Sequence, residues 1–316
     1  MKPVRMTVAA LLLAVLTPLT GFTQTDGATA PSALGPDGRM VDEVYPGLVS
    51  GALTYATLAD LSEGRILQSG SLVISQSDME AALSEVPKNA QEEMTENLFF
   101  LLEQKTTRDL LLQSAREQSG NAADTPKDQD VLIRGYLEKA VGDIQVKDAE
   151  VAEFYEENKD MCGGASLDQI KGELKQYVLQ QKRQEAVTDH IRTLGQRRPI
   201  AVSAAWTKRQ AVLAMDNAVD KARRSGRPSL VDFGADGCRP CDMMAPILKD
   251  LRDKYAGKMN VEFIHVREKQ VLAARYGIQS IPVQILFDKT GKEVWRHTGF
   301  VPQPEIEKQL ARLGLE

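Results

Sequence analysis

The chain is poor in cysteine. Its 316 residues include three cysteines, of which Cys238 and Cys241 stand three positions apart and Cys162 stands alone. Three cysteines are too few for a disulfide scaffold. The chain also lacks a second closely spaced cysteine pair and any paired histidines, whereas a structural zinc site needs four ligands. The closely spaced pair, Cys238 and Cys241, is therefore the cysteine feature from which a function can be inferred.

The chain also lacks a concentrated basic region. Its formal net charge is −5, and no block of like charge stands out along the sequence. Phosphate binding requires a basic face that neutralises the nucleic-acid backbone. The charge pattern thus argues against a nucleic-acid partner.

Long hydrophobic runs are missing except for one at the N-terminus. Residues 6–19 are almost uninterrupted apolar residues, preceded by Lys2 and Arg5. This run is shorter than the ~20 residues of a membrane-spanning helix. We interpret residues 1–25 as a cleaved secretory signal, with an uncleaved N-terminal anchor as the alternative. Either interpretation places the mature chain in the periplasm or outside the cell.

The residues between the predicted signal and the first predicted helix form segments of different composition. Residues 26–69 read as a flexible tether followed by an irregular segment, with many Gly, Thr, Ala and Pro residues early in it. A short strand is expected at 71–75, and Ser77 with Glu80 has the spacing of a helix capping box. From there to residue 198 the apolar residues recur with helical periodicity. We expect an all-α domain over 70–198.

This helical region resembles the chaperone segment of the SurA and parvulin-type prolyl isomerases. The resemblance is carried by residues 75–80, 151–159 and 177–187. In that family a catalytic isomerase domain is usually inserted after the second of these segments, but here seven residues, 160–166, separate the two helices. The resemblance implies a domain that binds or positions unfolded protein clients, without prolyl isomerase activity.

The C-terminal third alternates between strand and helix patterns. Strands are expected at 229–233, 260–266, 283–288 and 293–297, and helices at 208–224, 241–255, 270–276 and 303–313. Strands that alternate with helices and end in a hairpin predict a mixed sheet flanked by helices.

The paired cysteines lie where a strand pattern gives way to a helix pattern. Free backbone N–H groups and the helix dipole at that point favour a thiolate at Cys238. Cys241, one turn further on, can attack a mixed disulfide formed by the first sulfur. Pro240 suits the first turn of a helix, and Arg239 adds a positive charge beside the nucleophile. The pattern predicts thiol–disulfide exchange.

Residues from about 205 to the C-terminus resemble thioredoxin. The parallels are 231–241 for the strand, loop and dithiol, 244–248 for the following helix, and 276–283 for the segment that carries a cis-proline. Gly299 matches a glycine that lines the substrate groove. The resemblance implies a thioredoxin fold over 199–316.

The same resemblance implies a role for each matched residue. Cys238 would be the attacking thiolate and Cys241 the resolving thiol. Asp232 would be the buried acid that helps move the proton of the resolving thiol, because burial raises the pKa of a carboxyl toward working pH. Pro282 would be cis, and the backbone of Ile281 would pair with an extended substrate.

Three positions depart from the family pattern. Gly237 stands where a tryptophan commonly precedes the first cysteine, Gly234 stands where an aromatic residue follows the strand, and Phe263 replaces a lysine near the buried acid. The glycine at 237 indicates a more open surface around the nucleophile. Phe263 leaves Asp232 without its usual cationic neighbour.

These patterns predict a two-domain α+β protein, with an all-α first domain and a thioredoxin fold second. The function that fits is a thiol–disulfide oxidoreductase, a reductase more than an oxidase or isomerase, that needs no small-molecule cofactor beyond its own disulfide. Its partners would be unfolded or disulfide-bearing proteins, with a DsbD-type membrane donor by analogy. The alternatives are a static bridge or half a zinc site at the dithiol, and a chaperone whose second domain only binds. Cys162 is interpreted as an incidental thiol.

Overall fold

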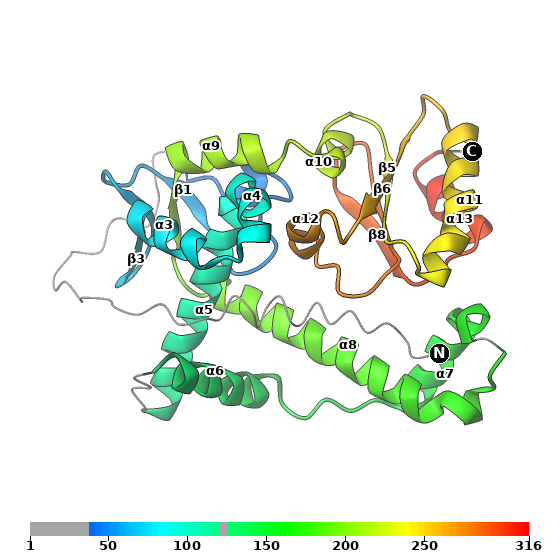
Figure 1. The fold of residues 1–316 in the computed structure, drawn as a ribbon, viewed down its shortest axis with the longest axis horizontal. Helices are drawn as coiled ribbons and strands as arrows, with labels where there is room; N and C mark the ends of the chain where they lie inside the picture. The colour runs from blue at the N-terminus through cyan, green and yellow to red at the C-terminus, as the bar shows by residue number, and fades with distance from the viewer. Residues whose placement is uncertain (1–37, 121–124, 163, 316) are drawn as a thin grey trace. The chain divides into compact units, whose positions relative to one another are not determined.

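The structure is a computed structural model that describes residues 38–120, 125–162 and 164–315 (Figure 1). The signal predicted at residues 1–25 lies outside the described residues. The described chain folds into two compact units. The first unit contains residues 38–150 and 173–214, and the second contains residues 151–172 and 215–315.

The first unit contains a four-stranded sheet in the order β1-β4-β2-β3. Its N-terminal elements are α2 (Val41–Val44), β1 (Thr57–Ala59), β2 (Arg65–Ser69) and β3 (Leu72–Ser75). β2 and β3 form an antiparallel hairpin that turns at Gly70, whose φ of 59° suits glycine. β4 (Ala201–Ser203) joins the sheet from far along the chain, parallel to β1 and antiparallel to β2.

Helices complete the first unit around this sheet. They are α3 (Gln76–Glu85), α4 (Lys88–Glu96), α5 (Leu98–Ser119), α6 (Pro126–Val141) and α9 (Ala204–Ala214). α5 is the most buried of them, and its Glu103 accepts hydrogen bonds from the backbone N–H groups of Ser50, Gly51 and Leu53. Burial raises the pKa of Glu103, and the three donors oppose that rise. This carboxyl fastens a loop to the central helix.

The remaining helices are α7 (Asp148–Glu157), the 3-10 turn η1 (Lys159–Cys162) and the long α8 (Leu167–Gln196). Leu111, Ile133 and Leu194 join α5, α6 and the end of α8 in one apolar cluster. Gly195 lets the end of α8 approach the loop at Ala52, because a Cβ there would lie 1.9 Å from the carbonyl oxygen of Ala52.

The prediction of an all-α first domain is wrong, since the first unit contains the sheet just described. Residues 38–69, predicted as tether and irregular chain, contain α2, β1 and β2. The capping box lies two residues earlier than predicted, between Ser75 and Asp78. Residues 201–214, which the sequence assigns to the C-terminal domain, belong to the first unit. The strands β1 and β4 are short and pair across more than 140 residues, so local patterning does not reveal them.

The second unit is built on a sheet in the order β6-β5-β7-β8. Its strands are β5 (Ser229–Gly234), β6 (Asn260–His265), β7 (Val283–Phe287) and β8 (Glu293–Thr298). β5 pairs in parallel with β6 and antiparallel with β7, and β8 closes the antiparallel side. The central β5 is buried along its whole length.

Four helices cover the two faces of this sheet, as Figure 1 shows. They are α10 (Ala218–Arg223), α11 (Arg239–Lys254), α12 (Gln270–Arg275) and α13 (Gln303–Arg312). On one face Val231 and Phe233 pack with α10 and α12. On the other face Leu230 and Leu286 pack with α11 and α13. Alternate residues of β5 thus fill two separate cores.

The helix predicted at 208–224 is two helices. α9 ends at Ala214, and α10 begins after Asn217, whose side chain accepts a hydrogen bond from the N–H of Asp220. An asparagine in this role caps a new helix instead of continuing the old one. No helix in the described part of the chain is long and apolar enough to cross a membrane.

Candidate active site

The dithiol occupies the start of α11, directly after the loop that leaves β5. Cys238 is the N-cap residue, and the backbone N–H of Cys241 points at its sulfur at 3.4 Å. The two cysteines form a disulfide with a Cα–Cα distance of 5.2 Å. Cys238 is half-buried, whereas the side chain of Cys241 is 5% exposed. The accessible outer sulfur is therefore the one that a partner can reach first.

The loop around the disulfide is open to solvent. Gly237 is exposed and has a φ of 71°, a conformation that glycine adopts without strain. Arg239 is exposed at the first position of α11, and Pro240 lies in the first turn, where a missing N–H costs no hydrogen bond. The N-terminus of α11 thus lies at the Cys238 sulfur, and a cationic residue follows it in the chain.

A second loop approaches the disulfide from the other side of the site. The Ile281–Pro282 peptide bond is cis, and the carbonyl oxygen of Ile281 lies 3.9 Å from the sulfur of Cys238. The carbonyl of Pro282 accepts a hydrogen bond from the N–H of Gly299 at 2.8 Å. The residues that the sequence predicts to bind substrate therefore lie together beside Cys238.

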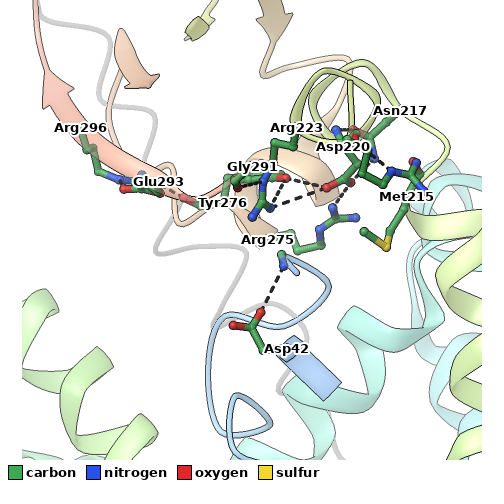
Figure 2. A network of polar contacts seen from close by, with 12 residues as sticks. Asp42, Met215, Asn217, Asp220, Arg223, Arg275, Tyr276, Gly291, Glu293 and Arg296 are labelled. Atoms are coloured by element: carbon green, nitrogen blue, oxygen red, sulfur yellow. Dashed lines mark hydrogen bonds and ion pairs between the residues drawn. The ribbon is translucent and has the colours of Figure 1, made fainter. Parts of the chain in front are cut away.

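A buried polar network holds the segment that leads into this loop (Figure 2). Asp220 is fully buried, forms an ion pair with Arg275 and accepts a hydrogen bond from the Tyr276 hydroxyl at 2.7 Å. Arg223 donates to the same hydroxyl and to the carbonyl of Gly291. Burial and the charge of Asp220 raise the pKa of Tyr276 to about 12. The network joins α10 to α12 immediately before residues 277–282.

Asp232 lies on the inner strand β5, which leads into the dithiol loop. Its carboxyl group is fully buried, and Oδ1 accepts a hydrogen bond from Gln284 Nε2 at 2.6 Å. Among the described residues, Oδ2 has no hydrogen-bond partner. Burial raises the pKa of Asp232 to about 6, against the opposing effect of Gln284. A carboxyl with this pKa can exchange a proton near neutral pH.

Gln284 is a site residue that the sequence patterns did not predict. Its signal is a single polar residue within the otherwise apolar strand 283–287. Gln284 is directly opposite Asp232 in the register of β5 and β7. His265 was likewise not predicted to lie at the site, and its Nε2 is 3.4 Å from the backbone nitrogen of Asp236 in the dithiol loop.

Comparison with known proteins places this site in a family. A model of the thioredoxin-like domain matches residues 215–314. The chain is 41% identical over 91 residues to thioredoxin from Alicyclobacillus acidocaldarius, which is 29% of this chain and 86% of that protein. This chain belongs to the thioredoxin-like family.

Other relatives match the same thioredoxin-like domain. Thioredoxin from Staphylococcus saprophyticus is 37% identical over 101 residues, which is 32% of this chain and 95% of that protein. A solved structure of Fasciola hepatica thioredoxin is 28% identical and covers 28% of this chain and 81% of its own, with a TM-score of 0.26.

The thioredoxin-like domain gathers the predicted site residues in one place. Cys238, Cys241, Pro240, Arg239 and Gly237 form the dithiol loop. Ile281, Pro282 and Gly299 lie beside it, and Asp232 is buried on β5, the strand that leads into it. Cys162 is a half-buried free thiol in η1, and burial raises its pKa. In the described part of the chain, no group of three or more His, Cys, Asp or Glu residues is arranged to hold a metal ion.

Proposed function

We propose that this protein is an extracytoplasmic thiol–disulfide oxidoreductase that acts on disulfide-bearing proteins and works chiefly as a reductase. The observation that carries the proposal is the asymmetry of the dithiol. Cys238 is half-buried at the N-terminus of α11, while Cys241 and Asp232 are shielded behind it. A nucleophile that faces outward, with a protected thiol and a buried base behind it, suits two-step exchange.

The first step is attack by the Cys238 thiolate on a substrate disulfide. A bond forms between the Cys238 sulfur and one substrate sulfur, the substrate disulfide breaks, and the other substrate sulfur leaves as a thiolate. The N-terminus of α11 and the charge of Arg239 stabilise the attacking thiolate. The nearby carbonyl of Ile281 marks where an extended substrate segment would lie.

The second step releases the product. The Asp232 carboxylate accepts the proton of the Cys241 thiol, and the Cys241 thiolate then attacks the Cys238 sulfur. The Cys238–Cys241 bond forms, the mixed disulfide breaks, and the second substrate thiolate leaves and takes up a proton from water. Two electrons pass from the dithiol to the substrate. No cofactor beyond the protein disulfide takes part.

The rest of the proposal concerns location, clients and electron supply. The apolar run at residues 6–19 supports export to the periplasm or beyond. The resemblance of residues 75–80 and 177–187, in the first unit, and of residues 151–159, in the second, to SurA-type chaperones supports a role of these segments in binding or positioning clients. A reductase in that compartment needs an electron source. A DsbD-type membrane protein would supply electrons by reducing the Cys238–Cys241 disulfide through thiol–disulfide exchange.

Replacement of the nucleophile tests the enzymatic proposal. Cys238→Ser is expected to abolish reduction of a disulfide-bearing model protein while circular dichroism shows an intact fold. Cys162→Ser is the matched control, and its turnover is expected to equal that of the wild type. Undiminished turnover in Cys238→Ser would contradict the proposal. A variant that lacks both cysteines of the pair could still suppress client aggregation. That result, together with undiminished turnover in Cys238→Ser, would favour the alternative function, a chaperone whose thioredoxin-like domain only binds.

The direction of electron flow is tested by the reduction potential of the Cys238–Cys241 couple. The protein is equilibrated in graded thiol buffers, and free thiols are trapped with a mass tag. A reduction potential of about −270 mV is expected for a reductase, whereas a value of about −120 mV would indicate a donor of disulfides.

A further inference from the structure

Phe263 lies on the same face of the sheet as the buried acid of the dithiol site. Asp232 on β5 is directly opposite Phe263 on β6 in a parallel pairing, and residues in register point to the same face. That face also carries Leu230 and Val261, which pack under α11. The ring of Phe263 is therefore a neighbour of the Asp232 carboxyl and not of the opposite core.

The absence of a side chain at Gly234 gives the Phe263 ring its place. A Cβ at Gly234 would lie 2.8 Å from Phe263 Cε2 and 3.4 Å from the sulfur of Cys241. The ring and the resolving sulfur thus approach the same point from two sides. The Phe263 ring therefore lies beside Gly234, near Cys241 and on the face of the sheet that carries Asp232.

The exposed fraction of Phe263 differs sharply from those of Asp232 and Cys241. β6 is the edge strand of the sheet, and Phe263 is 44% exposed. Asp232 is 0% exposed and Cys241 is 5% exposed. An exposed ring on the edge strand thus neighbours two buried groups.

We propose that Phe263 is a positioning residue of the exchange reaction, whose ring keeps water away from Asp232 and Cys241 so that the proton passes between those two groups. The inference rests on the proposed function and deepens it. The ring supports the raised pKa of Asp232, because desolvation is its largest cause. An aromatic ring from the neighbouring strand thus occupies space that a side chain at 234 would need.

Other ionisable groups surround Asp232 on the elements packed against it. His265 follows Phe263 on β6, and the two rings lie 6.4 Å apart. His297 on β8 is paired with Gln284. Arg252 on α11 donates to the carbonyl of Val261. His265 is an ionisable residue on this edge strand, so the test must separate its contribution from that of Asp232.

The test follows both steps of exchange in the full-length, reduced protein with Cys162→Ser as background. Stopped-flow mixing with dithiobis(nitrobenzoate) gives one coloured thiolate when Cys238 attacks and a second when Cys241 resolves the mixed disulfide. The second phase is recorded across pH. Phe263→Ala is expected to lower the acid-side midpoint of that phase by ~1 pH unit and to leave the first phase unchanged.

Three further variants refine the test. Phe263→Leu keeps an apolar cover and is expected to retain the wild-type midpoint. Phe263→Lys places a cation beside the carboxyl and is expected to lower the midpoint at least as far as alanine does. Val294→Ala, at a position on β8 with the same 44% exposure, is the control and is expected to change nothing.

The outcomes distinguish this inference from the proposed function. If Asp232→Asn removes the effect of Phe263→Ala while His265→Gln preserves it, the inference stands. An unshifted second phase in both Phe263→Ala and Phe263→Lys would overturn it, even if the thermal midpoint falls. Absence of the first phase in the background protein would instead overturn the proposed function. If the alanine variant does not fold, the leucine and lysine variants decide.

Discussion

Asp232 makes the stability of the thioredoxin-like domain depend on pH. Its folded-state pKa is about 6, whereas the ordinary value is 3.8. Between these values the folded protein holds a proton that the unfolded chain has lost, so the free energy of unfolding falls as pH rises through this window. A difference of about two pKa units corresponds to about 3 kcal/mol.

Asp232→Asn is therefore expected to match the wild type in stability below about pH 3 and to exceed it by about 3 kcal/mol once the pH is well above the folded-state pKa. The measurement is urea unfolding followed by Trp295 fluorescence in a Trp206→Phe background. Because both proteins share every other ionisable group, their difference isolates Asp232. A difference that stays constant with pH would contradict a raised pKa.

Gly234 gives a second prediction at a single residue. Gly234→Ala is expected to displace the Phe263 ring, because the new Cβ would lie 2.8 Å from Cε2. The pH midpoint of the resolving step should then move in the same direction as in Phe263→Ala, and the two changes should not add. Gly135→Ala, where a Cβ meets nothing within 4 Å, is the control. Strict additivity would show that the two positions act separately.

At the scale of elements, α10 and α12 are joined by a buried ion pair. Asp220 is 0% exposed and Arg275 is 2% exposed, so loss of the carboxylate would leave a buried, uncompensated charge. Such losses cost about 3–5 kcal/mol. The pair matters to the site because α12 leads directly into the cis-proline loop.

Asp220→Ala is accordingly expected to lower the free energy of unfolding of the thioredoxin-like domain by about 3–5 kcal/mol. Asp253→Ala removes an exposed ion pair with Lys249 and is expected to cost much less, because solvent screens the pair. Urea titrations of both variants, read at Trp295, make the comparison. Equal costs would mean that the network in Figure 2 contributes no more than a surface pair.

At the scale of the whole molecule, the second unit carries its own two cores and the complete dithiol site. Residues 215–316 alone are expected to fold and to react with dithiobis(nitrobenzoate) at the rate of the full chain. They are expected to reduce an unfolded protein client several-fold more slowly, because the first unit, which we propose binds clients, is missing. Equal rates with the protein client would remove the proposed role of the first unit.

The periodicity of the sequence predicted most of the C-terminal elements, because each of those strands and helices has a strong local pattern and a clear turn between neighbours. The strand at 283–287 and the helix at 303–312 are examples. The sheet of the first unit was not predicted. Its three-residue strands β1 and β4 are too short to show a period, and their pairing depends on chain segments that meet only after folding.

The close cysteine pair at a strand-to-helix junction, the nearby acid and the proline segment could each be predicted from the sequence, because each is carried by residues adjacent in the chain. The surroundings of these groups depend on the assembled fold. Gln284 and Phe263 reach Asp232 from neighbouring strands. Local sequence does not encode which side chain will exclude water from a carboxyl, because burial is a property of the assembled sheet and not of any one segment.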